Sequence, residues 1–228
     1  MKIIALSLIL FLNYSLFGQV LLCDLNFEKI PYRKVRNYIH DQVDNQILSI
    51  YDLHPTLETK KVPAEYSCQD IRYLIDEDID VVWEGYIHSS PAKLWDGKRL
   101  SFGLLCSKPS EMVVYRGDQN VEVDTGQVIY LNLRFLRGVY NLALAFEIID
   151  LDEENRTIEF SYIEGNKSKG KQCLVFKQTP EGKTEIIHSS YFKSDSILRD
   201  KLIYPFFHKR ATNEFHRNMR RNIRKDQA

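Results

Sequence analysis

The stretch GKTEIIHSSYFKSDSILRDKLIYPFFHKRATNEFHRNM, residues 182–219, begins as a strand and continues as an amphipathic helix. Apolar residues recur every fourth position through its second half and just beyond it, at Phe207, Ala211, Phe215, Met219 and Ile223. This spacing predicts a long helix with one apolar stripe, which needs an apolar partner such as the face of a sheet. Pro205 is compatible with a helix start or a kink. Residues 194–204 are therefore expected to form a preceding turn or a hinge.

Strand-like runs occupy most of the chain before this helix. Six of them span residues 111–118, 126–136, 139–151, 156–165, 170–179 and 183–192. Turn-forming residues separate the runs, and the short connections predict antiparallel neighbours in a meander. An earlier run, SCQDIRYLI at 67–75, is short and rich in β-branched and apolar residues, which predicts one further strand.

Two short helices are expected near the N-terminal side of the sheet. Residues 31–51 place apolar side chains near helical spacing, and residues 52–65 contain two prolines and read as a linker. After the first strand, one apolar helical face is formed by Ile79, Val82, Trp83, Tyr86 and Ile87. The acidic first turn of this segment suits a helix N-terminus, and Pro91 is expected to end the helix.

The first 18 residues have the layout of a secretory signal peptide. Lys2 precedes an apolar run of roughly ten residues, and a small residue, Gly18, follows. The run is shorter than the roughly twenty residues that span a bilayer. The sequence therefore predicts an exported protein, periplasmic or secreted, whose mature chain begins near Gln19.

Charge and motifs exclude several classes of function. The net charge is zero, but residues 197–228 carry nine Lys and Arg against three Asp and Glu. This basic helix suits weak contact with an anionic membrane surface, but we prefer the simpler interpretation that its charges form the solvated face of a helix. No nucleic-acid-binding signature accompanies it, so no nucleic-acid partner is expected.

The four cysteines and the histidines form no metal-binding pattern. There is no CxxC pair, and His188, His208 and His216 form no HxxxH pair. GxSxG, P-loop and GxGxxG motifs are also missing. We therefore expect no metal and no cofactor, and we assign no catalytic residue.

The order of these elements resembles the START-like superfamily, which includes polyketide cyclases, lipid-transfer domains and birch-pollen-allergen-like proteins. The resemblance is carried by residues 160–176, 182–194 and 203–219. Within this superfamily, these segments resemble more narrowly a bacterial secreted family of unknown function. It implies an α+β helix-grip fold, in which a curved antiparallel sheet of about seven strands wraps a long C-terminal helix. The expected divisions are a signal peptide at 1–18, an N-terminal helical extension and linker at 19–65, the helix-grip domain at 66–224 and a tail at 225–228. In this fold the strand with Cys68 neighbours the last strand, so no Cys68–Cys173 disulfide is expected.

What the resemblance implies for function is a cavity for a hydrophobic or amphipathic small molecule, lipid-like or polyketide-like. The candidate ligand-binding residues are Tyr130, Arg134, Glu147, Tyr162, His188, Tyr191, Phe207 and Phe215. The alternative for each aromatic candidate is that it packs in the core and does not line a cavity. The alternative for Arg134 and Glu147 is that they lie on the outer face of the sheet.

Three functional hypotheses remain open from the sequence. We favour a non-catalytic binding protein. The first alternative is a cyclase- or hydrolase-like enzyme that acts on its guest in the same cavity, with His188 or Glu147 as general acid or base. The second alternative is a protein-interaction module without a ligand.

Overall fold

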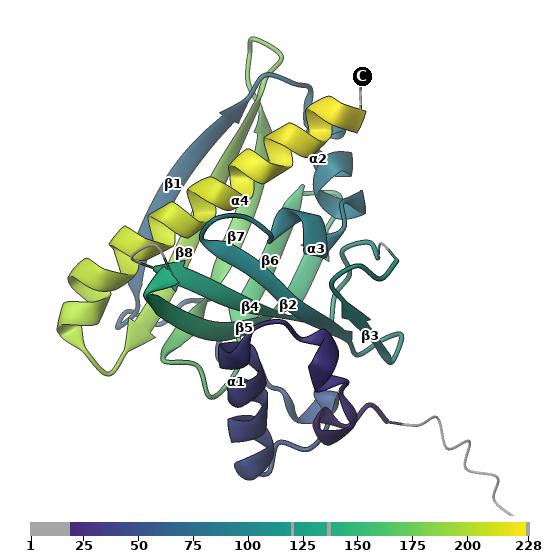
Figure 1. Cartoon of the computed structure of the whole chain (residues 1–228). Coiled ribbons are helices and arrows are strands. Elements are labelled where there is room, and N and C mark those ends of the chain that lie inside the picture. The colour runs from purple at the N-terminus through teal and green to yellow at the C-terminus, as the bar shows by residue number, and fades with distance from the viewer. Residues whose placement is uncertain (1–18, 120, 136–137, 227–228) are drawn as a thin grey trace, which may run out of the picture.

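A computed structural model describes residues 19–119, 121–135 and 138–226 of the chain. The predicted signal peptide lies outside the described residues. Eight antiparallel strands form one sheet with the order β1-β8-β7-β6-β5-β4-β2-β3. The strands are β1 (Ser67–Ile75), β2 (Leu100–Ser107), β3 (Met112–Tyr115), β4 (Gln127–Phe135), β5 (Tyr140–Asp152), β6 (Thr157–Tyr162), β7 (Ser168–Gln178) and β8 (Thr184–Ser194). The long helix α4 (Tyr204–Asp226) crosses the concave face of this sheet (Figure 1), so the predicted α+β helix-grip fold is confirmed.

The sheet has eight strands where about seven were expected, because β2 was not predicted. All eight residues of β2 are buried, so it shows no alternation of apolar and polar residues. Phe102 and Leu105 belong to the core beneath α4, whereas Leu104 and Cys106 belong to a second core on the opposite face. A strand that is buried on both faces lacks the period of two that marks a half-exposed strand.

The apolar stripe of α4 packs as its spacing predicts. Phe215, Met219 and Ile223 are buried in the main core with the short helices α2 (Ile79–His88) and α3 (Pro91–Leu94). The expected turn before Pro205 is a π-helical turn, η5 (Arg199–Ile203), in which Tyr204 donates its backbone N–H to the carbonyl of Arg199. Such wide turns occur mostly as single-turn features at functional sites.

Residues 19–65 pack against the outer face of β2, β4 and β5. The segment contains α1 (Arg33–Asp44) and three short 3₁₀ turns, η1 (Leu22–Asp24), η2 (Phe27–Lys29) and η3 (Ile50–Asp52). Its buried apolar side chains include Leu22, Ile30, Val35, Ile39 and Ile50, which contact the outward side chains of the sheet. The N-terminal extension therefore covers a sheet face that would otherwise expose apolar surface.

The pairing of β7 with β8 is close at Gly170. This residue has a φ of +134°, and a Cβ there would overlap the carbonyl oxygen of Tyr191. β8 lies between β1, which carries Cys68, and β7, which carries Cys173. The predicted separation of these two thiols is confirmed, and all four cysteines are free.

Among the described residues, no helix combines the length and the apolar character that crossing a bilayer requires.

Candidate functional site

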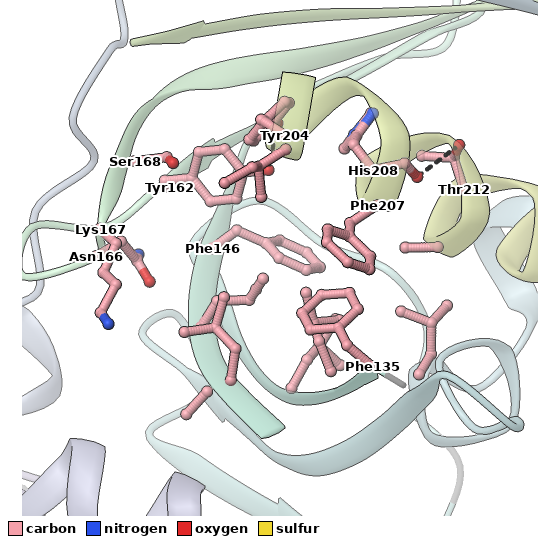
Figure 2. A pocket seen from close by; sticks show the side chains of 18 of the residues that line it. Phe135, Phe146, Tyr162, Asn166, Lys167, Ser168, Tyr204, Phe207, His208 and Thr212 are labelled. Atoms are coloured by element: carbon pink, nitrogen blue, oxygen red, sulfur yellow. Dashed lines mark hydrogen bonds between the residues drawn. The ribbon is translucent and has the colours of Figure 1, made fainter. Parts of the chain in front are cut away.

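A cavity of about 460 Å³ lies between the concave face of the sheet and the first half of α4. Its floor consists of inward side chains of β4 and β5, and Figure 2 shows the rings of Phe135, Phe146 and Phe207 facing one another across the space. The volume falls within the range of small-molecule sites. The lining is mostly apolar, so the cavity suits a guest with hydrophobic surface.

Alternation along two adjacent strands builds this floor. Residues 131, 133 and 135 of β4 and residues 142, 144 and 146 of β5 all line the cavity. Leu131 pairs with Leu144 in the register of the two strands, so inward side chains from both strands form one continuous apolar surface. Small Ala211 on α4 leaves the space above this floor open.

Aromatic rings stack at both ends of the space. Trp95 stacks on Phe215 with ring centroids 4.1 Å apart, and it also contacts Phe146 at 5.0 Å. At the other end, Tyr204 stacks on Phe192 at 3.8 Å. These contacts fix the positions of the rings that border the cavity.

One wall of the cavity is polar. The hydroxyl groups of Tyr162 and Tyr204 lie 2.6 Å apart, and the Gln172 amide donates to the Tyr162 hydroxyl at 3.0 Å. His208 and Thr212 also border the cavity, but the imidazole nitrogens of His208 are turned away from Phe135 and Phe146 (Figure 2). The polar side chains that line the cavity thus include the two tyrosines, and Asn166, Lys167, Ser168 and Arg199 border it as well.

A buried histidine network lies behind this wall. The Gln172 carbonyl oxygen lies 2.7 Å from His188 Nε2 and 2.9 Å from His208 Nε2. Since an amide oxygen only accepts, both Nε2 atoms donate. The unprotonated Nδ1 of His188 then accepts from His216 Nε2 at 2.8 Å, and His216 Nδ1 accepts from the Tyr86 hydroxyl at 2.6 Å.

Burial keeps the groups of this network neutral. It lowers the pKa of His208 and His216 to about 3 and that of His188 well below its ordinary value. It also raises the pKa of Tyr162 to about 12 and that of Tyr204 well above its ordinary value. At neutral pH the wall therefore presents uncharged donors and acceptors.

The structure brings some of the sequence-predicted residues to the cavity. Tyr162 and Phe207 line it directly. Phe215 lies in the core at one end, beneath Trp95, and His188 lies behind Gln172 in the histidine network.

The other four candidates lie elsewhere. Tyr130 and Glu147 are on the outer face, where Tyr130 donates to Gln42 of α1 at 3.0 Å and Glu147 pairs with Lys108 at 2.6 Å. Burial raises the pKa of Glu147, and the bond from Lys108 opposes that shift. Tyr191 alternates with the inward His188 and Ser190 along β8, and Arg134 donates to the carbonyl of Gly97. None of the four lines the cavity.

Sequence reasoning missed most of the residues that border the cavity, among them Trp95, Gln172, Tyr204 and His208. Tyr204 and His208 could have been found, because they precede Ala211 at helical spacings of seven and three residues. Trp95 lies just after α3, in a turn whose direction no periodicity reveals.

No protein-family model and no curated protein sequence matches this chain. Solved structures with a similar fold include a norcoclaurine synthase point mutant from Thalictrum flavum in complex with a transition-state analogue. Its TM-score is 0.53 at 13% identity, covering 74% of this chain and 100% of that one. The same enzyme in complex with dopamine and hydroxybenzaldehyde has a TM-score of 0.50 at 14% identity, covering 74% of this chain and 96% of that one.

Major latex-like protein 151 from Panax ginseng also has a TM-score of 0.50 at 14% identity, covering 69% of this chain and 97% of that one. Identities this low show the fold alone. The resemblance to START-like and birch-pollen-allergen-like proteins is therefore confirmed at the level of the helix-grip fold.

Proposed function

We propose that this protein binds a hydrophobic or amphipathic small molecule, lipid-like or polyketide-like, in its internal cavity without changing it chemically. The observation that supports this most strongly is the apolar space of about 460 Å³ beneath α4. Burial of roughly 200 Å² of apolar ligand surface would contribute about 5 kcal/mol before the entropic costs of association. That is enough for useful affinity without charge pairing.

The polar wall favours a guest with an uncharged oxygen-containing group. Tyr162 and Tyr204 bond to each other, and a ligand hydroxyl or carbonyl can share that pair without leaving a buried group unpaired. A carboxylate or ammonium group in the same position would lose its hydration without gaining an opposite charge. We expect charged ends of a ligand to stay at the cavity mouth.

The contacts of the ionisable groups support binding over catalysis. His188 and His216 bond to protein partners through both ring nitrogens, and Glu147 lies on the opposite face of the sheet. His208 donates from Nε2 to Gln172, and its Nδ1 lies 3.2 Å from the Gln69 amide oxygen, so neither ring nitrogen is directed at the cavity, where a general base would act. The presence of a cavity also favours a ligand-binding protein over a protein-interaction module, which would need no internal cavity.

The proposed compartment rests on the first 18 residues. Their charged start and apolar run support export to the periplasm or the medium. N-terminal sequencing of the exported protein should begin near Gln19. A sequence that still began at Met1 would contradict export by cleavage.

A naphthalene sulfonate dye, which fluoresces in apolar surroundings, tests the cavity. We expect the wild type to bind about one dye per chain. Ala211→Trp fills the cavity and should weaken dye binding at least tenfold, since overpacking excludes the guest. Arg217→Trp adds the same ring to the exposed face of α4 and should leave binding unchanged. Equal binding by wild type and Ala211→Trp, while both are folded, would contradict the proposed function.

A further inference from the structure

An exposed apolar cluster lies beside the cavity. Five large apolar residues within ten positions, from just before η5 to the first turn of α4, have exposures between 45% and 75%, namely Ile197, Leu198, Leu202, Ile203 and Phe206. On the tip of the β4–β5 hairpin, Val139 is 86% exposed and Tyr140 is 48% exposed. We name these seven residues the entrance patch. Soluble proteins rarely expose such a concentration without a partner.

The two parts of the entrance patch lie on either side of one opening. Ile203 and Tyr140 both line the cavity. Phe135 at the end of β4 contacts Phe207 of α4 with ring centroids 4.3 Å apart, and it stacks on Tyr140 at 6.0 Å. Figure 1 shows the start of β5 beside the first half of α4. A ligand that enters here must pass the entrance patch.

Basic side chains border the entrance patch. Exposed residues of this kind in the β6–β7 turn, in η5 and in the first turns of α4 are Lys167, Lys201, Lys209 and Arg210. Arg199 donates to the carbonyl of Lys167 at 3.1 Å, which joins η5 to the β6–β7 turn, and Arg210 lies 3.4 Å from the ring centre of Phe206. The acidic residues of the same segments are Glu164, Asp195 and Asp200, and Asp200 accepts the backbone N–H of Ser194. The border is therefore positive on balance.

We propose that the entrance patch docks onto an anionic lipid bilayer, so that the ligand passes between the bilayer and the cavity. The inference rests on the proposed function. Exposed aliphatic and aromatic side chains with Lys and Arg at their border match the interface of a membrane, where the apolar part enters the acyl boundary and the charges meet phosphate groups. A second copy of the chain fits less well, because its own basic border would face this one.

The membrane contact expected from the structure lies at a different part of α4 from the one expected from the sequence. The sequence alone suggested that the whole basic C-terminal helix contacts the membrane. The entrance patch instead lies at the start of α4, and the 23 residues of this helix separate it from the C-terminal end by about 30 Å. This distance exceeds the screening length of about 10 Å at moderate salt, so the two ends act separately. Variants at each end therefore distinguish the two locations.

Brominated lipids test which surface enters the bilayer. Phe206→Trp places a fluorescent reporter in the entrance patch. Met112→Trp places a reporter of similar exposure on the edge strand β3, outside the entrance patch. Both are made in the full chain, so the N-terminal apolar run is the same in each. With vesicles of phosphatidylglycerol and brominated phosphatidylcholine, we expect quenching of the new fluorescence for Phe206→Trp and none for Met112→Trp. Equal quenching, or none at Phe206→Trp, would overturn the inference.

Charge variants test the anionic partner. Lys201→Gln with Lys209→Gln should weaken the affinity of Phe206→Trp protein for anionic vesicles roughly twentyfold, since each basic residue near the surface contributes about fivefold. Arg224→Gln with Lys225→Gln removes the same charge from the far end of α4 and should change this affinity for anionic vesicles less than about twofold. Equal effects would overturn the location, and a dimer that Leu202→Gln dissociates would assign the entrance patch to a second copy.

Dye binding in solution separates this inference from the proposed function. If the wild type binds the dye but the fluorescence of the Phe206→Trp variant is not quenched by brominated lipid, docking alone is refuted. Quenching without dye binding refutes the ligand cavity and leaves the docking surface standing.

Discussion

Acidification should destabilise this protein through His188, His208 and His216, which are buried in neutral form between α4 and the sheet. Their pKa values in the folded chain lie below the ordinary value of 6.5, at about 3 for His208 and His216. The unfolded chain therefore takes up protons first as the pH falls. The stability that comes from neutral burial is complete above pH 6.5 and is lost as the pH falls toward the folded pKa values.

The magnitude follows from the pKa difference. Below pH 6.5 each such histidine costs roughly 1.4 kcal/mol of unfolding free energy per pH unit until its folded pKa is reached. At about pH 5 this amounts to roughly 2 kcal/mol for one histidine and roughly 6 kcal/mol for all three. A domain typically has about 5–15 kcal/mol in total, so acid unfolding is expected near this pH.

Denaturant unfolding at a series of pH values measures this slope. His208→Gln should remove about one third of the dependence between about pH 6.5 and 5, because one of three uptake sites is gone. His88→Gln is the control, since exposed His88 contacts Glu84 and Glu122, which raise its pKa and give its small contribution the opposite sign. Equal slopes for wild type and His208→Gln would refute the neutral burial of this network.

Three further tests, two of them with a control substitution, probe the packing on both faces of the sheet and the pairing of β7 with β8. Phe215→Ala should lower the unfolding free energy by roughly 3–5 kcal/mol and Arg221→Gln by at most about 0.5 kcal/mol, and the reverse ranking in urea melts would place the helix stripe in solvent. Gly170→Ala should reduce the melting temperature far more than Gly182→Ala, which meets no atom within 4 Å, and similar melting temperatures would contradict the close β7–β8 approach. Tyr130→Phe should cost about 1–3 kcal/mol and leave dye affinity unchanged, whereas weaker dye binding would link the outer face to the cavity.

Periodicity allowed most of the fold to be predicted from the sequence. The four-residue recurrence along α4 and the apolar face of α2 depend on burial from one side, which leaves a clear signal. β2 was missed because it is buried on both sides, by α1 and by the core beneath α4. The covering role of residues 19–65 could not be predicted either, since their apolar residues do not reveal which surface they meet.

The cavity residues were harder to predict because side-chain identity does not reveal orientation. Tyr130 and Tyr162 are both aromatic strand residues, yet one contacts α1 and the other lines the cavity. A shift of one residue in register moves a side chain to the other face of the sheet. Knowing that Leu131 and Leu144 pair on the inner face would have placed Tyr130 and Glu147 outside.

Native mass spectrometry of protein purified from its own source tests the central proposal, that an apolar guest occupies the space beneath α4. We predict one noncovalently bound molecule per chain, extractable into organic solvent and carrying an uncharged oxygen-containing group opposite Tyr162 and Tyr204. The same molecule should be missing from Ala211→Trp and retained by Arg217→Trp. Wild-type protein that carries no such molecule and takes none up from a lipid extract, or an Ala211→Trp variant that retains it fully, would contradict the proposal.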